Sequence, residues 1–143
     1  MISPLVLLVD DEVPFVETMT KRLSKRELRV ISAYSGREAL EKLEKNAVDV
    51  VILDVKMPGM DGIETLREIK RGHPLVEVIM LTGHATVETA VEGMRLGAFD
   101  YLMKPCEMEE LLAKVGEAKD RKSKHEQKIM DARMKEITLR RGM

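Results

Sequence analysis

Residues 5–11 read LVLLVDD, five apolar side chains followed directly by two aspartates. Two further segments repeat this arrangement of a short apolar run that ends in a polar side chain. They are VVIL at 50–53, before Asp54, and VIML at 78–81, before Thr82. Continuous apolar runs of four or five residues are typical of strands buried on both faces, as in a parallel sheet. The pattern therefore predicts three central strands with chemistry at their carboxyl ends.

Segments with helical spacing separate these strands from each other and from two weaker strand candidates, RVISA at 29–33 and AFDYL at 98–102. Ser35 and Asp61 precede two of the helical segments as candidate caps. A third segment carries an apolar stripe made of Val87, Ala90, Val91 and Met94. Strand and helix alternate five times, which predicts an α/β fold with a doubly wound parallel sheet.

Length and composition exclude several classes of protein. The chain has 143 residues, of which 44% are hydrophobic, so we expect one domain with a short appendage. It has neither an apolar run long enough to span a membrane nor the pattern of a signal peptide. Cys106 is the only cysteine, which excludes an intrachain disulfide and a cysteine-rich zinc site and predicts a reducing, cytoplasmic environment.

Charge is unevenly distributed along the chain. Residues 1–113 hold 14 basic and 20 acidic side chains, a net of −6, whereas residues 114–143 hold 10 and 5, a net of +5. We expect a domain over 1–120 and a basic helical extension or linker over 121–143. The segment KDRKSKHEQK at 119–128 has no strongly apolar residue and is predicted to supply no packing face. The tail is interpreted as a solvated helix, a nucleic-acid or partner-binding arm, or a linker.

The polar residues at the strand ends predict a phosphoryl site. In an open α/β sheet the carboxyl ends of the strands form one rim. That rim would hold Asp10, Asp11, Asp54, Thr82 and Lys104. Clustered carboxylates repel each other unless positive charge neutralises them, and oxygen ligands without cysteine or histidine favour Mg²⁺. The hypothesis is a Mg²⁺-dependent phosphoryl site that acts either on a free substrate or on the protein itself.

Four motifs resemble a known family, the receiver domain of two-component response regulators. They are LVDDE at 8–12, DVKMPGMDG at 54–62, LTGHA at 81–85 and DYLMKP at 100–105. The resemblance covers about residues 4–118 and is strongest to receivers of the NtrC type, which precede sigma-54 activator domains. It implies a five-stranded, flavodoxin-like or CheY-like (βα)5 fold with strand order 2-1-3-4-5.

The resemblance also implies roles for individual residues. Asp54 would accept a phosphoryl group from a phosphohistidine of a sensor histidine kinase or phosphotransfer protein. Lys104 would pair with Asp54 before transfer and, like Thr82, contact the phosphoryl group after it. Tyr101 and Thr82 would form the switch, and Lys56 and His84 would tune hydrolysis. Mg²⁺ would be held by Asp11, Asp54 and the backbone carbonyl of Lys56, and by Asp10 through water.

The expected function is a phosphorylation-activated signalling switch of a phosphorelay, not an enzyme that acts on a free substrate. The alternative is the regulatory receiver of a DNA-binding, sigma-54-dependent type of transcriptional regulator. A Mg²⁺-dependent phosphohydrolase is disfavoured because it would need a DxD-type spacing after the first strand, whereas Asp10 and Asp11 are adjacent. A pseudo-receiver, which is never phosphorylated, is disfavoured because all five functional positions are intact. We expect no membrane partner, no nucleic-acid binding by this domain and, by resemblance, a homodimer on phosphorylation. The sequence leaves open a stand-alone receiver or part of a longer regulator.

Overall fold

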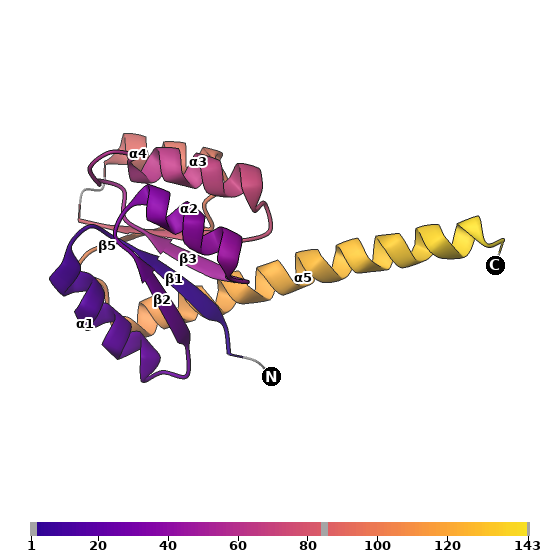
Figure 1. Cartoon of the computed structure of the whole chain (residues 1–143), viewed down its shortest axis with the longest axis horizontal. Coiled ribbons are helices and arrows are strands. Elements are labelled where there is room, and N and C mark those ends of the chain that lie inside the picture. Colours follow the sequence, from indigo (N-terminus) through magenta and orange to yellow (C-terminus); the bar gives the residue numbers. More distant parts are fainter. Residues whose placement is uncertain (1–2, 84–85, 143) are drawn as a thin grey trace.

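A five-stranded parallel sheet lies between two layers of helices in the computed structural model, which describes residues 3–83 and 86–142 (Figure 1). The strands run in the spatial order β2-β1-β3-β4-β5, and all neighbours are parallel. Their bounds are β1 (Leu5–Val9), β2 (Arg29–Ala33), β3 (Val50–Leu53), β4 (Glu77–Thr82) and β5 (Asp100–Met103). The predicted fold class and strand order are confirmed.

The helices cover both faces of the sheet. They are α1 (Val13–Ser24), α2 (Gly36–Lys45), α3 (Gly62–Gly72), α4 (Val87–Arg95) and α5 (Met108–Arg140). Helices α1 and α5 lie on one face, and α2, α3 and α4 lie on the other (Figure 1). Side chains alternate across each strand, so Leu7 and Val9 join one apolar core while Val6 and Leu8 join the other. The central strands are therefore buried on both faces.

Two helix starts agree with the predicted caps. The Ser35 hydroxyl accepts the Glu38 backbone N–H at 3.1 Å, and the Asp61 carboxylate accepts that of Glu64 at 2.9 Å. The Glu38 carboxylate returns to the backbone N–H of Tyr34 at 3.1 Å, one residue before the cap. These caps fix where the chain enters α2 and α3 after leaving the sheet.

The apolar stripe predicted on α4 forms, but it lies mostly on the surface. Val87 is 81% exposed, and Val91 and Met94 are each 47% exposed. The helix approaches the sheet through Gly93 instead, where an added Cβ would contact Met80 and Tyr101 at ordinary van der Waals distances. A stripe at helical spacing shows which face is apolar, but not whether another element covers it.

Helix α5 continues through residue 120 without interruption and projects beyond the body of the domain (Figure 1). The expectation that residues 119–128 have no packing face is wrong, because ion pairs dock the start of this segment. Arg121 contacts Glu77 of β4, and Lys119 and Lys122 contact Asp49, just before β3, at 3.0 and 3.3 Å. Every residue from 127 to 142 is exposed.

The predicted division of the chain at residue 120 stays a prediction.

None of the helices within residues 3–83 and 86–142 combines the length and the apolar content that crossing a membrane requires.

Candidate functional site

The carboxyl ends of β1, β3 and β4 bring together the polar residues that the sequence placed there. Asp10 and Asp54 directly follow β1 and β3, which are hydrogen-bonded neighbours in the sheet. The Asp54 backbone N–H donates to the Val9 carbonyl at 2.9 Å, so the ladder holds the two aspartates next to each other. Thr82 is the last residue of β4, and the Lys104 backbone N–H donates to its carbonyl at 2.8 Å. Hydrogen bonds of the sheet thus position the site.

Asp54 is a buried carboxylate whose charge is only partly compensated. The residue is 3% exposed, and its Oδ1 accepts the Val55 backbone N–H at 2.9 Å. Burial raises the pKa of Asp54, and the negative charge of Asp10 raises it further. A hydrogen bond with Thr82 and the positive charge of Lys104 oppose this shift without cancelling it. A cation that approaches Asp54 would therefore stabilise its ionised form.

Lys104 lies among the acidic residues at this rim. Its Nζ is 2.5 Å from Asp10 Oδ2 and 3.2 Å from Glu12 Oε1. Burial lowers the pKa of Lys104, but the hydrogen bond and charge of Asp10, with those of Asp54 and Glu12, outweigh it and raise the pKa. The ammonium therefore stays protonated. Among the contacts of the described residues, its ion pairs are with Asp10 and Glu12, and Asp54 acts on it through space.

The acidic cluster offers a site for a hard cation. Asp10, Glu12 and Asp54 each contribute a carboxylate oxygen, and these oxygens lie within 4.8 Å of one another. Glu12 and Asp54 border a hollow of about 450 Å³ that is also lined by Asp11, Lys56, Met57 and Pro58. A donor set made only of oxygen fits Mg²⁺, which retains several waters and uses few carboxylates. Asp11 and Lys56 line the same hollow, and their roles toward a metal stay a prediction.

The loop after Asp54 packs so tightly that it requires glycine. The Gly62 backbone N–H donates to the Val55 carbonyl at 2.7 Å. A Cβ on Gly62 would lie 2.1 Å from the Asp54 carbonyl oxygen and 2.5 Å from the Val55 Cα, both backbone atoms. Gly59, in the same loop, has a φ of +75°, which glycine adopts without strain. The start of α3 thus supports the backbone of Asp54 from behind.

The structure brings some of the predicted site residues together and places others apart. Asp10, Asp54, Thr82 and Lys104 interact directly or through their charges. Tyr101 is half-buried on β5, and its hydroxyl lies 3.0 Å from that of Thr89 on α4, away from the acidic cluster. His84 lies outside the described residues. The Lys104–Pro105 peptide bond is cis.

Sequence reasoning missed Glu12, which is the third carboxylate of the cluster. Its backbone N–H donates to Asp10 Oδ1 at 2.9 Å, and this turn returns the Glu12 side chain to the rim. The run of three acidic residues at 10–12 is the signal that could have indicated it.

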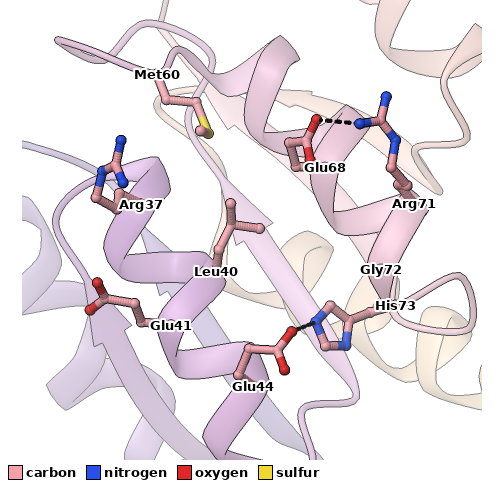
Figure 2. Close-up of a pocket in the computed structure, with 9 residues that line it drawn as sticks. All are labelled: Arg37, Leu40, Glu41, Glu44, Met60, Glu68, Arg71, Gly72 and His73. Atoms are coloured by element: carbon pink, nitrogen blue, oxygen red, sulfur yellow. Dashed lines mark hydrogen bonds and ion pairs between the residues drawn. The ribbon is translucent and has the colours of Figure 1, made fainter.

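A second hollow, of about 400 Å³, opens between α2 and α3, with Leu40 and Met60 toward its interior (Figure 2). Polar contacts form part of its wall: His73 Nε2 lies 3.2 Å from Glu44 Oε1, and Arg71 forms an ion pair with Glu68 at 3.1 Å. Its lining shares no residue with the hollow beside Asp54. Among the residues that the structure describes, no Ser, Thr or Cys lines this hollow, so it brings no hydroxyl or thiol nucleophile together with His73.

Known proteins resemble this chain in both sequence and structure. It is 40% identical over 113 residues to the transcriptional regulatory protein ZraR of Klebsiella oxytoca, which covers 79% of this chain and 26% of that protein. It is 38% identical over 114 residues to the DNA-binding transcriptional regulator NtrC of Escherichia coli K12, covering 80% of this chain and 24% of the relative. The chain thus spans about a quarter of the length of these curated relatives.

Solved structures agree. A response regulator receiver domain protein from Clostridium thermocellum has a TM-score of 0.80 and 37% identity, covering 84% of this chain and 97% of that one. A CheY-like receiver from Methanospirillum hungatei has a TM-score of 0.82 and 31% identity, covering 86% and 98%. The model of the response regulator receiver domain matches residues 6–116. The chain therefore belongs to the response regulator receiver domain family, whose members are signalling domains of two-component systems.

Proposed function

We propose that Asp54 receives a phosphoryl group from the phosphohistidine of a sensor histidine kinase or phosphotransfer protein. The observation that carries this proposal is a buried carboxylate with a raised pKa beside a hydroxyl and an ammonium. An Asp54 oxygen attacks phosphorus, the bond from phosphorus to the imidazole nitrogen breaks, and the imidazole takes up a proton. Hydrolysis of the acyl phosphate later returns the carboxylate.

The neighbouring side chains have roles that follow from charge. Thr82 and Lys104 donate to phosphoryl oxygens, so they stabilise negative charge that the acidic rim would otherwise repel. Asp11, Asp54 and the Lys56 carbonyl would hold Mg²⁺, with Asp10 reached through water. When bound, Mg²⁺ supplies positive charge that neutralises the carboxylates and the transferring group. Lys56 and His84 are proposed to control access of water to the acyl phosphate.

A change at Thr82 would be transmitted through Tyr101 to the surface of α4 and β5. Tyr101 packs against the apolar core, and its hydroxyl contact with Thr89 links β5 to α4. The large apolar side chains exposed on α4 and β5 are Val87, Val91, Met94 and Met103. We propose that this surface receives the output partner or a second copy of the chain after phosphorylation. Size-exclusion chromatography of phosphorylated and unmodified protein tests whether that partner is a second copy.

A second candidate function is the regulatory receiver of a DNA-binding transcriptional regulator in the cytoplasm. The relatives named above favour it, since both are transcriptional regulators and the match falls within about a quarter of their length. On this proposal the receiver unit ends near residue 120, and residues 121–143 are a basic helical extension or linker, in which α5 continues to Arg140. The unit itself is expected not to bind DNA, which gel-shift experiments at several salt concentrations would test.

Intact-mass spectrometry tests the proposed chemistry. The protein is incubated with acetyl phosphate, with and without Mg²⁺, beside Asp54→Asn as the matched variant. We expect one added phosphoryl group that requires Mg²⁺ and is absent in Asp54→Asn. An equal gain by the variant, or none by the wild type, would remove Asp54 from this role.

A further inference from the structure

Three groups surround the Lys104 ammonium, and all come from the segment that follows β1 and enters α1. Asp10 Oδ2 lies 2.5 Å away and Glu12 Oε1 lies 3.2 Å away. The third neighbour is the Phe15 ring, whose centroid is 4.0 Å from Nζ, a distance at which the ring face attracts a cation. Lys104 follows β5, an edge strand that β3 and β4 separate from β1. The ammonium is thus held on the Asp10 side of the rim.

The number of donors on the ammonium makes this arrangement restrictive. A lysine ammonium has three N–H donors and no acceptor. Two carboxylates and an aromatic face already occupy three directions around it. An ammonium that reaches a group on Asp54 therefore has to leave at least one of these neighbours. The contacts that Lys104 gives up determine how readily it moves.

We propose that Glu12 and Phe15 are positioning residues that hold Lys104 beside Asp10 and withhold it from Asp54 until a phosphoryl group arrives. This inference rests on the proposed function, in which Lys104 meets the phosphoryl group on Asp54. Asp10 is buried and belongs to the acidic rim itself, whereas the Glu12 side chain is 64% exposed. The hydrogen bond from the Glu12 backbone to Asp10 Oδ1 sets the turn that directs Glu12 toward the ammonium.

Exposure makes the Glu12 contact easy to break. Ion pairs with an exposed partner are weak, so losing this one changes the distribution of Lys104 by only about two- to fivefold. The same weakness suits a contact that has to open in each round of phosphorylation. Phe15 attracts the ammonium but is uncharged. Replacing Phe15 therefore changes the position of Lys104 without changing the net charge of the site.

Proton NMR of the metal-free protein measures the position of Lys104 directly. Protons near the face of an aromatic ring resonate upfield, and the chain has only two Phe and two Tyr residues to cause such shifts. We expect the ε-methylene protons of Lys104 to lie upfield of those of the other lysines. Glu12→Gln should reduce this shift and Phe15→Leu should abolish it. Glu17→Gln, an equal change of charge at an exposed position of α1, should leave it unchanged.

Phosphorylation by acetyl phosphate measures the consequence. At saturating Mg²⁺ and fixed ionic strength, Glu12→Gln and Phe15→Leu should each raise the rate about two- to fivefold, with Glu17→Gln unchanged. A rise in Phe15→Leu cannot come from net charge. A rate that is unchanged in both variants would overturn the inference, and so would an unshifted ε-methylene signal in the wild type. If the wild type takes up no phosphoryl group, the proposed function fails, and the NMR shifts alone decide whether Glu12 and Phe15 position Lys104.

Discussion

Both ends of the parallel sheet bury carboxylates, but they compensate them differently. At the amino ends of the strands, Glu77 is 2% exposed and contacts Arg121 and Lys70, while Asp49 contacts Lys119 and Lys122. At the carboxyl ends, the carboxylates of Asp10, Glu12 and Asp54 lie close together, and the Lys104 ammonium pairs with Asp10 and Glu12. Basic side chains neutralise the carboxylates at the amino ends. At the carboxyl ends, negative charge remains that a cation can neutralise or that phosphoryl transfer can employ.

The directions of the pKa shifts express this difference. Burial raises the pKa of Glu77, but hydrogen bonding and charge from Arg121 and Lys70 lower it below its ordinary value. Asp49 behaves alike, because the Leu5 backbone N–H and the lysines of α5 outweigh burial. At Asp54, burial and Asp10 prevail and the pKa is raised. Burial thus opposes the charged form at both ends, but the neighbouring groups outweigh it at Glu77 and Asp49 and do not outweigh it at Asp54.

Removing the charge of Glu77 should produce the largest effect. Glu77→Gln leaves Arg121 and Lys70 without their carboxylate. We expect the free energy of unfolding to fall by about 2–4 kcal/mol, a range that already allows for the partial exposure of Arg121. Urea unfolding measures it. The matched control is Glu136→Gln, which breaks an exposed pair with Arg140 and should change stability by less than about 0.5 kcal/mol. Equal losses in both variants would contradict the comparison.

Acid should break the same contact in the wild type. Because the pKa of Glu77 is lowered in the folded protein, its contribution is complete above its ordinary value of 4.5 and is lost as pH falls through the folded-state pKa. Asp54 has the opposite sign, since its raised pKa means that the ionised form costs stability, and this cost disappears on protonation. Unfolding measured from pH 7 to pH 3 should show a loss below pH 4.5 that is smaller in Glu77→Gln. Parallel curves for the two proteins would refute the assignment.

The carboxyl end can be disturbed without changing its charge. Gly62→Ala places a Cβ against the Asp54 carbonyl and the Val55 backbone, which cannot move aside as a side chain can. We expect a loss of about 1–3 kcal/mol in urea unfolding and slower phosphoryl uptake. Gly72→Ala is the control, because no atom lies within 4 Å of its added Cβ and it should match or exceed wild-type stability. A Gly62→Ala protein with wild-type stability would show that the loop adapts.

Neutralising one aspartate at each end should give opposite signs, in the smallest of these effects. Asp54→Asn removes an uncompensated charge and should stabilise the protein by about 0.5–2 kcal/mol at pH 7. Asp49→Asn weakens the contacts with Lys119 and Lys122 and should destabilise it. Thermal unfolding of the two variants beside the wild type measures both signs. Added Mg²⁺ should raise the melting temperature of the wild type more than that of Asp54→Asn. Changes of the same sign in both variants would remove the distinction between the two ends.

The sequence predicted the carboxyl end better than the amino end, for physical reasons. Apolar runs such as 50–53 indicate buried strands, and the residue that ends each run has to lie at the rim. Asp54 could therefore be placed without a structure. The acidic run at 10–12 indicates a further carboxylate there, but the place of Glu12 at the rim depends on a turn set by a backbone hydrogen bond to Asp10.

The docking of α5 could not be predicted from the spacing of apolar residues, because ion pairs hold this part of the helix against the sheet. Arg121 pairs with Glu77 and lies 4.7 Å from the centroid of the Phe99 ring. Glu77 and Arg121 are 44 residues apart in the chain, so nothing local in the sequence marks them as partners. The apolar stripe of α4 shows the converse, since the period was correct but the stripe remained exposed.

Chemical trapping of the phosphorylated residue tests the central claim most directly. The protein is incubated with acetyl phosphate and Mg²⁺ and reduced with borohydride, which converts an aspartyl phosphate to homoserine. Peptide sequencing by mass spectrometry then locates the modified position. We predict homoserine at position 54 and at no other aspartate. Homoserine at Asp10 or Asp11, or a phosphoryl group that borohydride does not remove, would contradict the assignment of Asp54 as the acceptor.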